Sequence, residues 1–222
     1  MNPAGISEVK KFSVDVSAER RFNLEELTSV SFALAKNTRF GTFGFLASNF
    51  GFTEYTEQKF ALVYAKKLSE IVRVGAQFDL LRYNIEQVGS KNVFTFEMGV
   101  QVQLNKEFSV ATHIFSPGNI YINDFTDLGT RYRVGVMYKP SAKVFLLAEA
   151  DKLIYRPLEY KIGLSYQLIP EAQIRLGINP SVEFYSFGAA FSIGKSMKIS
   201  SAIALQEVLG NTPAISFQYN QQ

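Results

Sequence analysis

The chain has 222 residues, with 20 Phe, 11 Tyr, no Trp and no Cys, and charged residues make up 19%. So many aromatic residues argue against intrinsic disorder, and no apolar run approaches the roughly 18 residues that a membrane-spanning helix needs. A net charge of +3 without a basic cluster gives no reason to expect a nucleic-acid partner. Because Cys is missing, disulfides, thiolate zinc sites and Cys nucleophiles are excluded.

Alternation of apolar and polar residues is the main signal along the chain. From Phe94 to Leu104 every second residue is apolar, while the residues between them include Glu97, Gly99 and Gln101. Short, frequent turns separate such segments and favour antiparallel neighbours. The pattern predicts about fourteen strands in one domain, 1–222, at residues 10–22, 28–37, 39–50, 57–68, 70–84, 92–104, 106–116, 130–139, 142–152, 157–168, 171–179, 181–193, 197–205 and 213–220.

Between the predicted strands, only Leu24 to Leu27 is typical of a helical turn, and the one long connection runs from Ser116 to Gly129. The sequence opens without a basic stretch followed by an apolar one, so we expect that a signal peptide is missing from it.

A small repeat occurs on the polar face of five predicted strands, where a charged residue stands two positions before a glycine. The pairs are Arg73/Gly75, Glu97/Gly99, Arg133/Gly135, Lys161/Gly163 and Arg175/Gly177. Glycine weakens a strand interior, but on the concave face of a curved sheet it relieves crowding. We therefore expect these glycines to face inward, with a neighbour's long side chain lying across them; unrelated bulges are the alternative.

The alternation fits two opposite architectures. In a soluble sandwich the apolar face forms the core, whereas in an outer-membrane barrel it faces lipid and the polar face lines the lumen. The segment 94–104 spans about 33 Å at about 3.3 Å per residue. Tilted by about 40°, it covers roughly 25 Å of membrane height, which matches the apolar band of such barrels.

Tyrosines and charges also favour the barrel. Tyr132 and Tyr138 bracket one apolar stretch, and Tyr160 and Tyr166 bracket another, as in the aromatic girdles at membrane interfaces. Charges of both signs lie on the polar face, and Arg133, Glu149, Lys161 and Arg175 on successive strands are expected to pair across the lumen.

The predicted fold class is therefore all-β, an antiparallel transmembrane β-barrel of about 14 strands, surrounded by lipid of the cell outer membrane. The residues predicted to line its lumen are Arg73, Asp79, Glu97, His113, Arg133, Glu149, Lys161 and Arg175.

An enzyme is poorly supported. His113 is the only histidine, and no nucleophile elbow, Walker-type loop or dinucleotide glycine motif is present. Glu149 with Asp151, or Glu97 with Glu159, could form paired carboxylates, but salt-bridge partners in the lumen are the preferred interpretation. No catalytic residue, metal site or cofactor is predicted.

Several short motifs carry a family resemblance over nearly the whole chain. They are Asn2-Pro3-Ala4-Gly5, Glu19-Arg20-Arg21-Phe22, Phe50-Gly51-Phe52 with Tyr55, Tyr64-Ala65-Lys66-Lys67-Leu68-Ser69, Tyr160-Lys161-Ile162-Gly163-Leu164-Ser165-Tyr166 and Arg175-Leu176-Gly177-Ile178. In this order they resemble the FadL-like outer-membrane proteins of Bacteroidota known as the PorV/PorQ group. The resemblance implies a fourteen-stranded barrel, with a role either in moving hydrophobic solutes or in type IX protein secretion.

The chain departs from this pattern in three ways. In FadL-type barrels the residues ahead of Asn-Pro-Ala form a hatch in the lumen, whereas here only Met1 precedes Asn2. The loops are short apart from Ser116–Gly129, and the chain ends on Gln222 rather than an aromatic residue. These departures favour a barrel with short loops that acts through a partner.

The main functional prediction is a non-enzymatic subunit or accessory of a larger, type IX-like secretion complex. Its partner contact is expected in the long loop, at Ile120, Tyr121, Ile122 and Phe125. The alternatives are a FadL-like channel or transporter for small hydrophobic molecules and a soluble β-protein that plugs a secretion pore.

Overall fold

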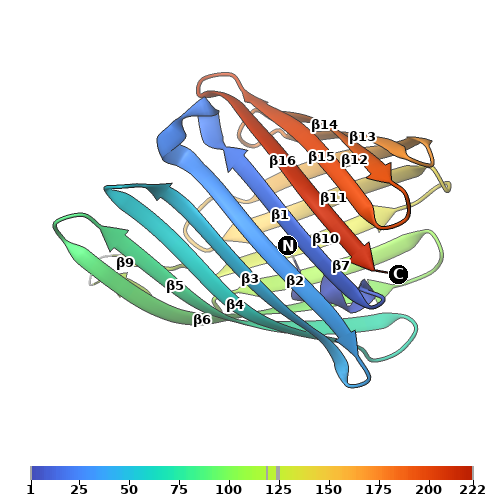
Figure 1. Ribbon diagram of the computed structural model, residues 1–222, viewed down its shortest axis with the longest axis horizontal. Helices are drawn as coiled ribbons and strands as arrows, with labels where there is room; N and C mark the ends of the chain where they lie inside the picture. Colours follow the sequence, from blue (N-terminus) through green and yellow to red (C-terminus); the bar gives the residue numbers. More distant parts are fainter. Residues whose placement is uncertain (1, 119, 124–125, 222) are drawn as a thin grey trace.

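The computed structural model describes residues 2–118, 120–123 and 126–221, and within them fourteen strands close into one antiparallel barrel (Figure 1). A separate two-stranded ribbon, β8–β9, stands outside the barrel ring. The strands are β1 Phe12–Arg20, β2 Thr28–Thr38, β3 Gly41–Phe52, β4 Tyr55–Lys67, β5 Val72–Ile85, β6 Gly89–Gln103, β7 Phe108–Phe115, β8 Tyr121–Asn123, β9 Thr126–Asp127, β10 Arg131–Tyr138, β11 Val144–Leu153, β12 Glu159–Ile169, β13 Ala172–Asn179, β14 Phe184–Ile193, β15 Met197–Gln206 and β16 Gly210–Gln221.

Barrel neighbours follow the chain order, with β7 beside β10 because the β8–β9 ribbon lies between them in sequence. The ring closes where β1 pairs with β16, with Ser17 opposite Ser216. The predicted barrel of about 14 strands is confirmed, and the sandwich alternative is wrong, because a sandwich keeps two separate sheets.

Alternate residues along each strand point inward and outward, and the apolar set faces out. On β6 the side chains of Phe96 and Val100 are 42% and 37% exposed, whereas Glu97 between them is only 7% exposed. Tyr132 and Tyr160 are also exposed on the outer surface. No helix among the described residues is long and apolar enough to cross a membrane.

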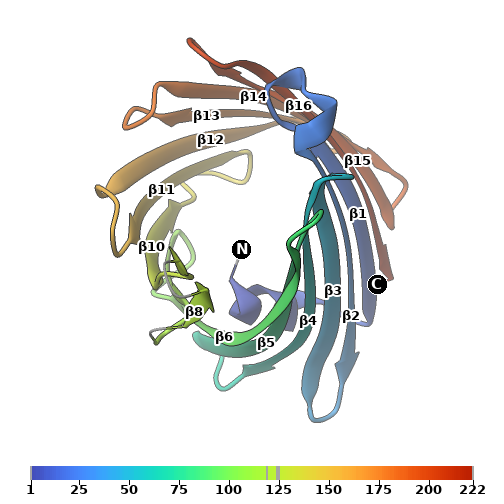
Figure 2. The same cartoon turned by 90° about the vertical axis from the view of Figure 1, so that its left-hand side faces the viewer.

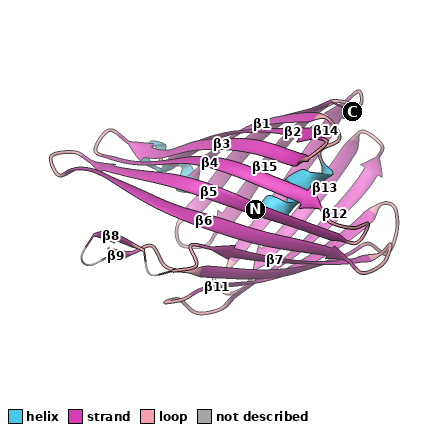
Figure 3. Cartoon of the chain, turned by 90° about the horizontal axis from the view of Figure 1, so that it is seen from below, coloured by secondary structure: helices cyan, strands magenta, loops and turns pink. Residues whose placement is uncertain are grey.

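The first residues of the chain lie inside the ring. A 3₁₀ helix, η1 Pro3–Glu8, packs against β3, β4, β5 and β6, and Figures 2 and 3 show it within the barrel. Asn2 and η1 together are called the plug below. The residues that carry the Asn-Pro-Ala-Gly motif therefore lie inside the barrel themselves and occupy part of its lumen.

The two ends of the barrel differ in their connections. The end of β16 and only short turns lie at one end, called the terminal end. The other, called the loop end, carries the 116–130 connection with its β8–β9 ribbon and the two short 3₁₀ helices η2 Arg21–Asn23 and η3 Glu25–Leu27. The predicted helical turn corresponds to η3, while η2 was not predicted.

Candidate functional site in the barrel lumen

The eight residues predicted to line the lumen lie on the inner face of seven barrel strands, β5, β6, β7, β10, β11, β12 and β13. The structure brings seven of them into three groups. Asp79, Glu97 and His113 meet on β5, β6 and β7. Arg133, Glu149 and Lys161 gather around Asp151. Arg73 binds the plug, whereas Arg175 lies apart from all of these.

The first group centres on a lysine that sequence analysis missed. Lys59 Nζ lies 3.2 Å from Asp79 Oδ1 and also binds Glu97 Oε1. Gln77 Nε2 donates to the same two carboxylates, at 2.8 Å and 3.0 Å. His113 Nε2 lies 2.6 Å from Glu97 Oε2. These five residues are called the Lys59 cluster.

Burial makes the Lys59 cluster a fixed part of the wall. Asp79 is 0% exposed and His113 only 5% exposed, so neither side chain can exchange its partners for bulk water. A buried charge is strongly destabilising once its partner is removed. Because Lys59 is, among the described residues, the one ammonium that contacts both carboxylates, it is the residue on which the cluster depends most.

The second group, called the Asp151 cluster, places three cations around one carboxylate. Arg131 binds Asp151 through two N–H···O bonds of 2.6 Å and 2.8 Å, the bidentate geometry that suits guanidinium and carboxylate. Lys161 Nζ lies 2.6 Å from Asp151 and 3.2 Å from Glu149, and Arg133 Nε lies 3.4 Å from Asp151. Lys161 pairs with Glu149 and Arg133 with Asp151, but both pairs join neighbouring strands along the wall rather than crossing the lumen as expected.

The plug sits on two of the repeated glycines. A side chain on Gly75 would collide with the backbone of Pro3 and Ala4, and one on Gly99 would collide with the amide of Asn2. Asn2 Nδ2 donates to the Thr112 carbonyl at 2.8 Å. At these two positions the missing side chain therefore makes room for the N-terminal segment, rather than for a neighbour's long side chain as expected.

A further contact ties the plug to the wall: Arg73 Nη1 lies 3.4 Å from Glu8 Oε1. Ala4 is 0% exposed, and the Asn2 side chain also accepts the backbone N–H of Ala4 at 2.9 Å. Nothing periodic in residues 2–8 signals this packing, so the sequence alone did not reveal it.

The wall opposite the plug is lined by small side chains. Five serines stand in register across neighbouring strands, and Ser17 Oγ lies 2.7 Å from Ser31 Oγ. In order from β3 to β15 they are Ser48, Ser31, Ser17, Ser216 and Ser200. Four of these serines line a hollow of about 440 Å³, together with Gly188, Ala202 and Ala214. The inner face therefore has a filled half and an open half.

The residues predicted for a partner contact lie at the loop end. Ile120 accepts a backbone hydrogen bond from Leu128, and Tyr121 and Ile122 belong to β8. Phe125 lies outside the described residues. The partner contact through this loop therefore stays a prediction.

Neither predicted carboxylate pair forms a catalytic dyad. Glu149 and Asp151 share Lys161, while Glu159 accepts a hydrogen bond from Asn179 rather than meeting Glu97. Within the described part of the chain, no group of three or more His, Asp or Glu side chains is placed to hold a metal ion.

Comparisons with known proteins give no match to a family model and none to a curated protein sequence. Solved structures do match. The Pseudomonas putida toluene transporter TodX superposes with a TM-score of 0.75 at 10% identity, over 100% of this chain and 93% of that one. The Ralstonia pickettii toluene transporter TbuX gives 0.73 at 10% identity, over 100% and 92%. A FadL homologue of Pseudomonas aeruginosa gives 0.68 at 10% identity, over 99% and 92%. These similarities show that the chain has the fold of FadL-like outer-membrane channels.

Proposed function

We propose that the chain is an outer-membrane channel through which small hydrophobic molecules diffuse. The observation that carries this proposal is the open half of the lumen, where serine, alanine and glycine residues line a hollow of about 440 Å³ opposite the plug. The fold shared with the toluene transporters supports it.

Placement in the outer membrane follows from the outer surface. Exposed apolar side chains such as Phe96, Val100 and Ile162 surround the barrel, and lipid rather than water suits such a surface. Barrels of this kind have short periplasmic turns and longer extracellular loops. We therefore place the terminal end, which includes the plug, toward the periplasm and the β8–β9 ribbon outside the cell.

The route through the barrel follows the open half. The plug covers the inner face of β3 to β6, and the Lys59 cluster adjoins it through Glu97 on β6, two residues from Gly99. The inward positions of β1, β2, β14, β15 and β16 carry mostly small residues, so a solute meets little steric hindrance there.

Purified protein in liposomes tests the channel. We expect uptake of radiolabelled toluene faster than in empty liposomes, and a steady conductance in planar bilayers. Heating should change the gel mobility of detergent-extracted protein. Such a change shows that the barrel was folded before heating. A heat-modifiable barrel with neither uptake nor conductance would rule out the channel.

The secretion-complex role predicted from the PorV/PorQ resemblance remains a second proposal with weaker support, since the structural comparisons identify channels. Deleting residues 118–127 and measuring co-purification of partner subunits from the native membrane tests it. Loss of a stoichiometric partner would support docking through this loop, and unchanged recovery would remove the loop from that role.

A further inference from the structure

Two cations in the open half of the lumen differ from the other lumenal cations. Five basic side chains on the inner wall each lie within 3.4 Å of a carboxylate: Lys59, Arg73, Arg131, Arg133 and Lys161. Among the described residues, neither Arg175 nor Lys198 has such an acidic partner. Arg175 is exposed in the lumen and Lys198 is half-buried, so both cations are accessible to a negatively charged solute.

Arg175 and Lys198 share one neutral oxygen. Arg175 donates from Nε and Nη2 to Gln173 Oε1, at 3.2 Å and 2.9 Å. Lys198 Nζ donates to the same oxygen at 3.2 Å. An arginine has five N–H donors and a lysine three, so most of their donors remain free for another acceptor. Two positive charges are thus held close together without a negative one between them.

The register of the strands places the two carboxylates of this wall, Asp15 and Glu19 on β1, away from both cations, although Glu19 lines the same hollow as Arg175. Lys198 stands opposite Gln218 on β16, and Gln218 stands opposite Asp15 on β1. Asp15 is therefore two strands away from Lys198, about 10 Å at the usual strand spacing. Arg175 stands opposite Ser165 on one side and Gly188 on the other.

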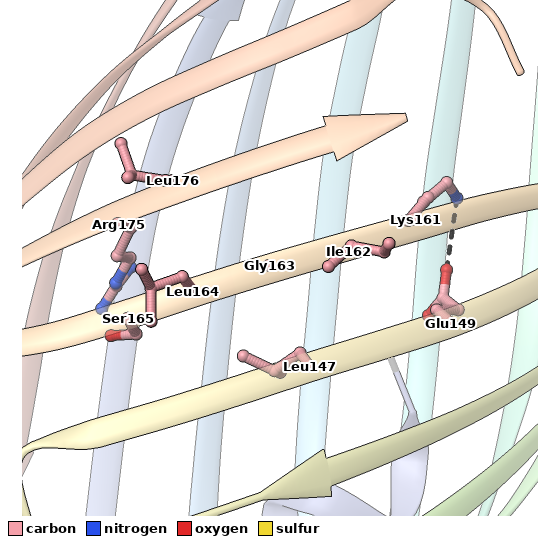
Figure 4. A pocket seen from close by; sticks show the side chains of 9 residues that line it. All are labelled: Leu147, Glu149, Lys161, Ile162, Gly163, Leu164, Ser165, Arg175 and Leu176. Atoms are coloured by element: carbon pink, nitrogen blue, oxygen red, sulfur yellow. Dashed lines mark hydrogen bonds and ion pairs between the residues drawn. The ribbon is translucent and has the colours of Figure 1, made fainter. Parts of the chain in front are cut away.

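Space for a ligand lies on both sides of Arg175. It lines the hollow of about 440 Å³ and also a second one of about 320 Å³. In Figure 4, Arg175 and Ser165 lie to one side of Gly163, and the Lys161–Glu149 pair lies to the other. Ser165 is only 8% exposed, and its hydroxyl has no hydrogen-bond partner among the described residues. Leu147, 45% exposed, adds an apolar surface beside Gly163.

We propose that Gln173, Arg175 and Lys198 form an anion site for a small carboxylate with an apolar body, of the size of benzoate. The planar guanidinium suits a carboxylate, Lys198 supplies a second positive charge, and Leu147 contacts the apolar part. The inference deepens the proposed channel and rests on it for the route by which the ligand arrives. The site would let the barrel bind small organic anions in addition to passing neutral hydrophobic molecules.

Calorimetric titration of detergent-purified protein tests the site directly. We expect saturable, one-to-one binding of benzoate and none of benzyl alcohol, which has a similar shape and no charge. Arg175→Gln and Lys198→Gln should each weaken benzoate binding by at least tenfold, and Arg175→Lys by less. Arg131→Gln removes the same charge from the lumen at the Asp151 cluster and should change affinity by less than twofold.

Several results would overturn the site. They are equal binding of benzoate and benzyl alcohol, equal weakening by Arg131→Gln and Arg175→Gln, or inorganic phosphate binding as tightly as benzoate. A heat-dependent change in gel mobility verifies that each variant is folded. If Arg175→Gln fails to fold, the affinities of Arg175→Lys and Lys198→Gln for benzoate still test the site. Conductance separates the two proposals: a conducting barrel that ignores benzoate refutes only the site, and a silent barrel that binds benzoate refutes only the channel.

Discussion

The plug offers a sharp test, because two glycines hold it against the wall. In Gly75→Ala the added methyl group meets backbone atoms of Pro3 and Ala4, which cannot move aside as the end of a flexible side chain can. The plug itself must shift. The matched control is Gly135→Ala on β10, where the new methyl group meets only Ala148 O at 3.6 Å, an ordinary contact.

The size of the effect follows from overpacking. Forcing an extra methyl group into a well-packed site costs about 1–3 kcal/mol. At about 1.4 kcal/mol per tenfold change, the ratio of docked to undocked plug falls by about 5- to 150-fold. Gly135→Ala has no such conflict and should be neutral or slightly stabilising, since alanine restricts the unfolded chain.

Labelling of a single cysteine measures the docked population. The chain has no cysteine, so Ser7→Cys introduces one thiol, in the plug. A water-soluble maleimide should label it about 5- to 150-fold faster with Gly75→Ala than without, while Gly135→Ala leaves the rate unchanged. Equal rates in all three proteins, or equal acceleration by both alanines, would show that Gly75 does not seat the plug.

Two further substitutions test the wall. Lys59→Met leaves Asp79 and Glu97 without their shared ammonium, so we expect the free energy of unfolding in urea to fall by about 3–5 kcal/mol; a loss below 1 kcal/mol would contradict the role given to this lysine. Phe187→Arg places a charge on the lipid-facing side of β14 and should cost about 2 kcal/mol, whereas Ser186→Arg faces the hollow and should cost less. The reverse order would mean that the faces are assigned incorrectly.

Sequence alone predicted the strands well because each strand has one face toward lipid and one toward the lumen, which requires apolar and polar residues to alternate. On β6 the alternation of Phe96, Glu97 and Met98 can be placed in only one way in a closed barrel with lipid outside. On β4 the inner positions Ala61 and Val63 are as apolar as the outer ones, so alternation gave no sign that Lys59 faces inward.

Other features depend on contacts between distant residues, which a pattern along the chain does not contain. Glu149 and Asp151 lie on the same face of β11, and only the register with β10 and β12 decides that Arg131 and Arg133 meet Asp151. The plug has no periodicity of its own. Its position depends on Gly75 and Gly99, which lie more than sixty residues away in the sequence.

For the electric field that a solute meets in the lumen, the positions of the charges matter more than the net charge of +3. Around the plug and on β10 to β12, cations and carboxylates lie in direct contact, so their fields largely cancel a few ångströms away. On the open wall, Arg175 and Lys198 have only a neutral amide between them, and low-dielectric walls concentrate an uncompensated field inside a cleft. A solute that reaches Arg175 and Lys198 therefore meets two neighbouring positive charges, and under the proposed anion site these two side chains retain negatively charged solutes.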